Sequence, residues 1–239
     1  MRTKKSTILS SKKKSNLAPS TGQKEYLVFI DWDGTLCYDR FWKDLRDDTS
    51  PYREIGKKID EFLFVKNKRL VRGWMKGKYS SEEINTLLSK ELDIPYKFLW
   101  ESFVRGARNM RMNPEAGREI KELRKYAHVC LITGNMDSFS RFTVKSQRLS
   151  DYFDIIINSY ERRRLKTEYR GREFKHIANS LGIDLKDTFL IEDSLKSCQT
   201  FKELGGTSFQ VHDEMDTVNS LQKIKAGLPQ KFKYNLHQK

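Results

Sequence analysis

Acidic and polar side chains directly follow several of the apolar runs in this sequence. Asp31 ends the first run and is followed two residues later by Asp33, Thr133 ends the second run, and Glu192 and Asp193 follow the fourth. A carboxylate can attack phosphorus, and a second carboxyl group can protonate a leaving alkoxide and later activate water. Crowded carboxylates repel each other unless a cation lies among them, and a hard divalent ion such as Mg²⁺ prefers oxygen ligands. Together these groups predict Mg²⁺-assisted phosphoryl transfer.

Five short apolar runs must position these groups, namely residues 26–31, 128–133, 154–158, 188–191 and 208–211. Continuous apolar runs of this length are typical of strands buried on both faces of a parallel sheet. Helical patterns lie between the runs, so we predict a doubly wound α/β sheet. Because ligands bind at the carboxyl ends of the strands in such sheets, the polar groups should meet at one edge.

Each of these motifs also has a simpler explanation when it is taken alone. An Asp-Gly pair is usually a turn, a Glu-Asp-Ser run is usually a helix cap, and an isolated lysine is usually a solvated charge. Several independent motifs would each have to place a compatible group at the same sheet edge by accident. The combination therefore favours a functional site.

A long helical segment interrupts the alternation of strands and helices. We predict an α/β core formed by residues 25–36 and 113–226, with a small helical domain, residues 37–112, inserted after the first strand. Residues 1–24 are predicted to be a basic, disordered tail, and residues 227–239 a second tail.

The net charge of the chain is +14, and half of it lies in the N-terminal tail. Residues 1–24 contain seven lysines and arginines and no acid, which leaves +7 for the other residues. A basic surface attracts phosphate esters, nucleic acid or anionic membranes. We interpret the tail as a solvated segment in preference to a nucleic-acid-binding arm, although nucleic acid or another polyanion stays a possible partner.

Neither a membrane segment nor a disulfide framework is expected. No apolar run approaches the ~20 residues that span a bilayer, and the N-terminal residues lack the apolar region of a secretory signal. The three cysteines, Cys37, Cys130 and Cys198, are far apart and form no metal-binding spacing. We therefore expect a reducing compartment and a cytoplasmic location.

The order of the motifs resembles that of the haloacid dehalogenase superfamily. The matching elements are Asp31-Trp-Asp-Gly-Thr35, Leu131-Ile-Thr133, Lys166 and Leu190-Ile-Glu-Asp-Ser194, and they extend over most of the chain. The last element resembles the branch that contains β-phosphoglucomutase and many sugar-phosphate phosphatases. The inserted helical segment resembles the cap domain of that branch, which closes over the active site.

The resemblance implies roles for the residues of the first two motifs. Asp31 would be the nucleophile and a metal ligand. Asp33 would be the general acid and base, and its carbonyl oxygen would also touch the metal. Thr133 would hydrogen-bond the phosphoryl group, with Gly134 and Asn135 close by to bind substrate.

The resemblance also implies the remaining charged groups of the site. Lys166 would stabilise the nucleophile and the phosphoryl charge, and Glu192 and Asp193 would hold Mg²⁺ directly or through water. Arg164 and Lys175 are competitors for the role of Lys166, because the proline that often follows this lysine in the family is replaced here by threonine.

Several cap residues are candidates for substrate contacts. Arg72 and Trp74 lie in a segment with two glycines that could shape a loop near the mouth of the site, and Arg40, Trp42 and Lys76 are further candidates. Burial of Trp74 in the core of the cap is an equally good interpretation.

The acid at position 33 separates the reaction classes of the superfamily. A halide leaves without protonation and the family's dehalogenases lack this acid, so Asp33 favours phosphate esters. We expect a phosphatase that acts on a small phosphorylated metabolite or nucleotide. A phosphomutase, a phosphatase acting on nucleic-acid ends or a macromolecule recruited by the basic tail, and a non-catalytic binding module are the alternatives.

Overall fold

A five-stranded parallel sheet forms the centre of the molecule. The computed structural model describes residues 24–236, with side chains through Leu228. The strand order is β3-β2-β1-β4-β5 and all pairs are parallel. The strands are β1 (Leu27–Ile30), β2 (His128–Thr133), β3 (Ile155–Asn158), β4 (Thr188–Glu192) and β5 (Thr207–Gln210). Each predicted strand is present, and the doubly wound α/β fold class is confirmed.

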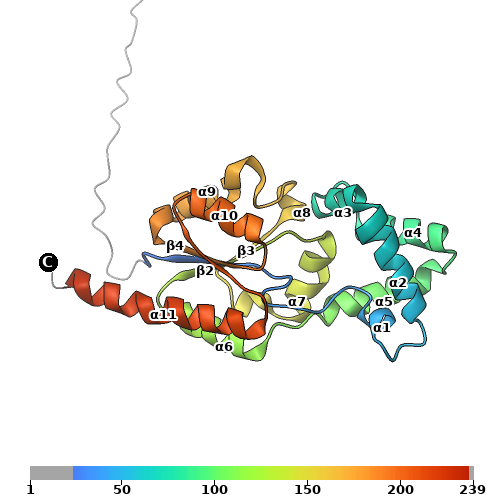
Figure 1. The fold of residues 1–239 in the computed structure, drawn as a ribbon, viewed down its shortest axis with the longest axis horizontal. Coiled ribbons are helices and arrows are strands. Elements are labelled where there is room, and N and C mark those ends of the chain that lie inside the picture. The colour runs from blue at the N-terminus through green and yellow to red at the C-terminus, as the bar shows by residue number, and fades with distance from the viewer. Residues whose placement is uncertain (1–23, 237–239) are drawn as a thin grey trace, which may run out of the picture.

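Helices cover both faces of the sheet, as Figure 1 shows. On one face lie α6 (Pro114–Leu123) and α11 (Glu214–Leu236), and on the other lie α9 (Glu168–Leu181) and α10 (Leu195–Glu203). Alternate residues of β1 point to opposite faces, so Val28 and Ile30 belong to one hydrophobic cluster and Leu27 and Phe29 to the other. This two-sided burial explains the continuous apolar runs in the sequence.

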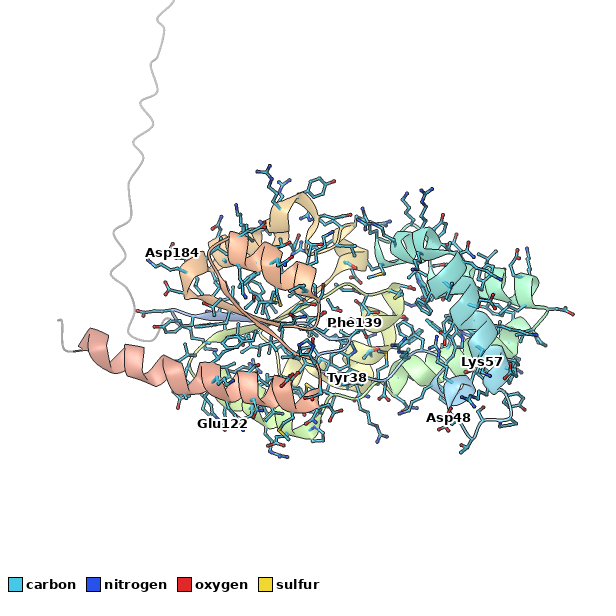
Figure 2. All side chains as sticks on the ribbon, in the orientation of Figure 1. Tyr38, Asp48, Lys57, Glu122, Phe139 and Asp184 are labelled. Atoms are coloured by element: carbon cyan, nitrogen blue, oxygen red, sulfur yellow. The ribbon has the colours of Figure 1, made fainter. Side chains whose placement is uncertain are left out.

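Several shorter elements lie between β2 and β4 along the chain. They are a π-helical turn (Phe139–Thr143), α7 (Val144–Ser146), a 3₁₀ turn (Leu149–Asp151), α8 (Ser159–Arg162) and a second 3₁₀ turn (Leu185–Asp187). Phe139 is fully buried and lies between the sheet and the helices inserted after β1 (Figure 2).

The helical insert follows β1 and lies beyond the carboxyl ends of the strands (Figure 1). It contains α1 (Lys43–Arg46), α2 (Arg53–Asp60), a π-helical segment (Glu61–Lys66), α3 (Lys68–Met75), α4 (Ser81–Leu92) and α5 (Tyr96–Arg108). Three fully buried aromatic residues, Trp42, Trp74 and Phe103, pack against one another at its centre. These side chains belong to the same hydrophobic cluster as Val28 and Ile30 of β1, and all the helices of the insert fall within residues 37–112.

The C-terminal helix is longer than the sequence analysis predicted. Residues 227–236 continue α11, whereas we expected a tail from residue 227 onwards. The physical reason is the spacing of Val218, Leu221, Ile224 and Leu228, which places all four side chains on one buried face. Leu228 thus belongs to the core that α11 forms with the sheet.

The predicted basic tail lies, except for Lys24, outside the described part of the chain. The prediction of a nucleic-acid partner rests on the same residues and stays a prediction. Lys24 forms an ion pair with Asp154, with Nζ 3.7 Å from Oδ2. Cys37, Cys130 and Cys198 are buried free thiols. Between residues 24 and 236, no helix has both the length and the apolar character to cross a membrane.

Candidate active site

A tight turn after β1 presents the first two acids. The backbone N–H of Asp31 donates to the carbonyl of Ile191 on β4 (3.0 Å), which continues the sheet by one residue. The N–H groups of Leu36 and Cys37 both donate to the carbonyl of Trp32, which closes the turn. Asp31 is 7% exposed, and its Oδ1 atom has no hydrogen-bond partner among the described residues. A buried carboxylate oxygen in this state needs a ligand.

Glycine at position 34 allows two of the acidic loops to approach each other. Gly34 has a φ of +69°, which side chains other than glycine rarely adopt. A Cβ atom at this position would also lie 2.6 Å from Oδ2 of Asp193. The glycine therefore allows Asp193, which follows β4, to lie against the turn that carries Asp31 and Asp33.

Lys166 lies in the centre of the acidic groups. Its Nζ atom is 2.7 Å from Asp31 Oδ2 and 2.5 Å from Glu192 Oε2, and it donates to the carbonyl of Ile132 (3.3 Å). Burial acts to lower the pKa of Lys166, but the charges of Asp31 and Glu192 outweigh burial and raise it. Lys166 is therefore a permanent cation that bridges two carboxylates.

The two competitors for the role of Lys166 are placed elsewhere. Arg164 donates through Nε to the buried carboxylate of Glu173 (2.7 Å), and Lys175 is exposed on α9. Of the three basic residues considered from the sequence, the structure brings only Lys166 to Asp31.

The loop after β2 brings a hydroxyl and an amide to the same edge. Thr133 is 2% exposed, and its Oγ1 atom lacks a hydrogen-bond partner within the described part of the chain. Asn135 is fully buried and donates through Nδ2 to Oδ2 of Asp33 (2.9 Å). The loop thus supplies an unpaired donor beside the acids and orients the carboxyl group of Asp33.

Asp33 has a perturbed pKa. Crowding by protein atoms and then the charge of Asp31 raise the pKa of Asp33 to about 7, against the opposing charge of Lys166. The side chain nevertheless opens onto a water-accessible pocket, so the residue is exposed. A carboxyl group with a raised pKa that faces a pocket is suited to donate and accept protons near neutral pH.

Three acids could hold a metal ion. Carboxylate oxygens of Asp31, Glu192 and Asp193 lie within 4.8 Å of one another. Burial and the charge of Asp31 raise the pKa of Glu192, although Lys166 opposes them. This crowding of carboxylates and the unpaired oxygen of Asp31 fit a hard divalent cation. The side chain of Asp33 is not part of the cluster, and its contact through the carbonyl oxygen stays a prediction.

A cavity of about 410 Å³ opens from these groups toward the insert. Asp33, Gly134 and Asp193 line its catalytic end, and Phe64 and Val71 of the insert line its far end. A Cβ atom on Gly134 would lie 3.0 Å from Cε of Met75, so the end of α3 lies directly over the loop after β2. The volume is that of a small-molecule site.

Two of the predicted substrate contacts do not line this cavity. Trp74 is fully buried in the core of the insert, where its Nε1 donates to Asp137 Oδ1 (3.1 Å). Arg72 pairs with Glu168, with Nη2 2.6 Å from Oε1, and faces a shallower hollow next to the cavity. The core-packing interpretation therefore describes Trp74. Of the other candidates, Arg40 lines the cavity.

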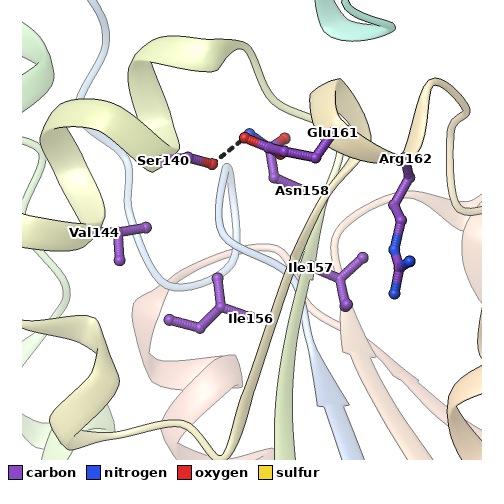
Figure 3. Close-up of a pocket in the computed structure, with 7 residues that line it drawn as sticks. All are labelled: Ser140, Val144, Ile156, Ile157, Asn158, Glu161 and Arg162. Atoms are coloured by element: carbon purple, nitrogen blue, oxygen red, sulfur yellow. Dashed lines mark hydrogen bonds between the residues drawn. The ribbon is translucent and has the colours of Figure 1, made fainter.

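A second hollow, shown in Figure 3, lies beside the edge strand β3. It has a volume of about 460 Å³, and its lining contains none of the predicted site residues. Apolar side chains such as Ile156 and Val144 line part of it, and Asn158 donates to Ser140 Oγ across it (3.0 Å). It is slightly larger than the acid-lined cavity, but Glu161 is the single acid of its described lining and no acid cluster lies there, so we assign the chemistry to the acid-lined cavity.

Sequence reasoning missed two residues that hold the loop after β2. The backbone N–H of Asn135 donates to Asn158 Oδ1 (3.2 Å) and to Ser159 Oγ (3.1 Å). Ser159 Oγ also donates to the carbonyl of Met75 (2.7 Å), which links this loop to the insert. Asn158 ends β3 and Ser159 directly follows it, so the strand-end argument used for the acids could have found them.

The parallel sheet and the acids at its carboxyl edge define an α/β enzyme of the doubly wound class. Residues 27–205 match the model of the haloacid dehalogenase-like hydrolase family, which is most of the chain. The protein therefore belongs to the haloacid dehalogenase-like hydrolases.

Solved structures of this family share the fold at low sequence identity. The enzyme BT-2542 from Bacteroides thetaiotaomicron, described in complex with magnesium and inorganic phosphate, has a TM-score of 0.61 and 21% identity over 79% of this chain and 96% of its own. A predicted hydrolase of the family from Porphyromonas gingivalis has a TM-score of 0.63 and 18% identity over 83% and 97%. The L-2-haloacid dehalogenase from Xanthobacter autotrophicus, with chloropropionic acid covalently bound, has a TM-score of 0.56 and 14% identity over 82% and 87%. No curated protein matches the chain.

Proposed function

We propose that this protein is a Mg²⁺-dependent phosphomonoester hydrolase that acts through a phosphorylated Asp31 on a small phosphorylated metabolite or nucleotide. One observation carries the proposal. Asp31 has one oxygen paired with Lys166 and a second, buried oxygen without a partner among residues 24–236, while the neighbouring acid Asp33 faces the cavity. The residues that we assign as nucleophile and counter-ion are thus in contact, and the residue that we assign as proton donor faces the cavity.

The metal requirement rests on the chemistry of the acids. Asp31, Glu192 and Asp193 would hold Mg²⁺, which when bound would neutralise phosphoryl charge and help to orient the ester. The description of BT-2542 in complex with magnesium and inorganic phosphate supports this choice of ion.

The chain's own residues would then perform the transfer. Asp31 attacks phosphorus, and Asp33 gives its proton to the leaving oxygen, for which the raised pKa suits it. Asn135 holds the carboxyl group of Asp33 in place through its 2.9 Å hydrogen bond. Lys166 and the Thr133 hydroxyl stabilise the charge on the phosphoryl oxygens. Asp33 finally takes a proton from the water that hydrolyses the phosphorylated Asp31.

Asp33 also distinguishes ester hydrolysis from dehalogenation. A structural neighbour is a dehalogenase, and a halide needs no proton in order to leave. A carboxyl group that is held by an amide and has a pKa raised to about 7 can protonate a leaving alkoxide, which a halide does not require. The arrangement therefore supports esters as substrates.

The test is phosphate release from a panel of phosphate monoesters, with Mg²⁺ and with a chelator. We expect turnover that needs Mg²⁺ and that is lost in Asp31→Asn. The matched control is Asp184→Asn, because Asp184 lies on the surface far from the cavity (Figure 2). Equal turnover of wild type and Asp31→Asn would refute the proposal.

A further inference from the structure

Apolar side chains form a large part of the lining of the acid-lined cavity. Met110 and Met136 line it together with Phe41, Phe64, Val71 and Met75. Five of these six residues lie within residues 37–112, so the insert and its connecting segments supply most of this surface. Such a surface gains free energy by contact with an apolar group, and methionine adapts its shape to irregular ligands.

The polar side chains of the same cavity are mostly engaged with other protein groups. Arg46 donates through Nε to Asp60 Oδ2 (3.1 Å) and also pairs with the carbonyl of Phe41. Asp39 accepts from Lys43 Nζ (2.5 Å) and from the backbone N–H of Arg111 (3.0 Å). These groups offer little to a ligand that is rich in hydroxyl groups, because a new hydrogen bond would have to replace an existing one.

One cation of the cavity has no ion pair or hydrogen bond within the described part of the chain. Arg40 lies in the same lining as Asp33, and its positive charge acts on the Asp33 carboxyl group. It is therefore close enough to the catalytic end to match the charge of a phosphoryl dianion. Near Phe64 and Val71, the charged residue that lines this cavity, Arg46, is paired with Asp60, whereas the exposed Lys68 and Arg69 line the neighbouring hollow.

We propose that the substrate is a phosphate monoester whose alcohol part is uncharged and apolar, either aromatic or branched aliphatic, and that this part lies between the insert and the loop after β2. The proposal rests on the proposed phosphatase function and narrows its substrate class. The phosphoryl group lies at Asp31 and Arg40, and the apolar part extends past Met75 toward Phe64 and Val71. A sugar would leave its hydroxyl groups without partners against these side chains.

The experiment compares two esters that leave as similar primary alkoxides, phenethyl phosphate and glycerol phosphate, in Mg²⁺. Because both alcohols leave with similar difficulty, the ratio of their kcat/KM values reports contacts of the alcohol part and not of the phosphoryl group. We expect phenethyl phosphate to be favoured at least tenfold, which corresponds to about 1.4 kcal/mol.

Two isosteric variants show where the preference arises. Val71 is 9% exposed and lines the cavity, whereas Val65 is 65% exposed and lies outside it. Val71→Thr places a hydroxyl group in the apolar wall and should lower the ratio at least threefold, on the order expected for one mismatched polar group. Val65→Thr makes the same chemical change on the surface and should leave the ratio as in wild type. Should Val71→Thr fail to fold, Met75→Gln makes the same test.

The outcomes separate this inference from the proposed function. Turnover of both esters with a ratio near or below one, or a ratio that Val71→Thr and Met75→Gln do not lower, overturns the inference and leaves the phosphatase function standing. No turnover of either ester, or of any other phosphate monoester, removes the proposed function and the inference with it. A high ratio that falls in Val71→Thr and not in Val65→Thr supports the inference.

Discussion

The ammonium group of Lys166 lies 2.7 Å from Asp31 and also reaches Glu192, so that one buried cation joins the acid ending β1 to the acid ending β4. The contact links the carboxyl ends of two neighbouring parallel strands. Without Lys166, two buried carboxylates would face each other with no cation of the protein between them. The lysine is thus expected to stabilise the fold as well as the reaction.

Replacement of Lys166 should therefore change both stability and activity. In Lys166→Met we expect the free energy of unfolding in a chelator to fall by about 3–5 kcal/mol, because the partner charges stay buried. Turnover should fall at least about 10²-fold, as for the loss of a group that stabilises transition-state charge. Denaturant unfolding and phosphate release measure the two effects. Lys175→Met on the exposed face of α9 is the control, and a Lys166→Met enzyme within tenfold of wild type would contradict the assignment.

The hydroxyl group of Thr133 should be needed for phosphate binding and not for folding. Because its Oγ1 is buried without a partner in the described structure, Thr133→Val should keep or raise the free energy of unfolding. The inhibition constant of inorganic phosphate should rise about tenfold, which is a loss of about 1.4 kcal/mol. In the control Thr188→Val, a hydroxyl that donates to Leu185 (2.6 Å) is lost, so stability should fall by about 1 kcal/mol and phosphate inhibition should not change. If Thr133→Val lowered the free energy of unfolding and left the inhibition constant of phosphate unchanged, Thr133 would have no role in phosphate binding.

The loss of Asp33 should depend on the leaving group. A general acid contributes about 10²–10⁴-fold where the leaving alkoxide must be protonated, and far less where it leaves readily as an anion. In Asp33→Asn, kcat for an alkyl phosphate should therefore fall much further than kcat for p-nitrophenyl phosphate. Equal losses for the two esters would show that Asp33 supports the site without transferring a proton.

The ion pairs of Glu168 with Lys76 and Arg72 of the insert should contribute a pH-dependent part of the free energy of unfolding. Burial acts to raise the pKa of Glu168, but the hydrogen bonds from Lys76 and Arg72 outweigh it and hold the pKa below its usual value. The resulting stabilisation is fully present above the unfolded-state pKa of about 4.3 and is lost as the pH falls through the lower folded-state pKa. Glu168→Gln should cost about 1 kcal/mol at neutral pH and much less at the acid end of this window.

Thermal unfolding across this pH range measures the difference between wild type and Glu168→Gln. The control is Glu122→Gln, whose partner Lys125 lies in the same surface segment and does not connect the insert to the core. A difference between wild type and Glu168→Gln that grows as the pH falls would contradict the assigned ion pairs.

The strands and their terminal acids could be predicted from the sequence because the information is local. The run that ends at Asp31 is apolar without interruption, and the parallel arrangement of β1 and β4 places Asp31 and Glu192 at one edge. Lys175 falls inside a helical pattern of the sequence, which argues against it as the lysine of the site, and the structure places it on the exposed face of α9.

The parts that the sequence did not predict depend on contacts between distant residues. The sequence left the burial of Trp74 open, and its Nε1 donates to Asp137, 63 residues away, while Arg72 pairs with Glu168, 96 residues away. Helical spacing in the insert cannot reveal which face meets the core. The length of α11 was underestimated because Gly227 and Pro229 resemble an end signal, while Leu228 continues the buried face of the helix.

The most direct test of the central claim is to find the phosphoryl group on Asp31. The enzyme would be mixed with a phosphate monoester in Mg²⁺, quenched in acid within one turnover, and reduced with borohydride, which converts an acyl phosphate of aspartate to homoserine. Peptide mass spectrometry should then find homoserine at position 31, and only when the ester is present. Efficient turnover with unmodified aspartate at position 31, or with homoserine at another acid, would contradict Asp31 as the nucleophile.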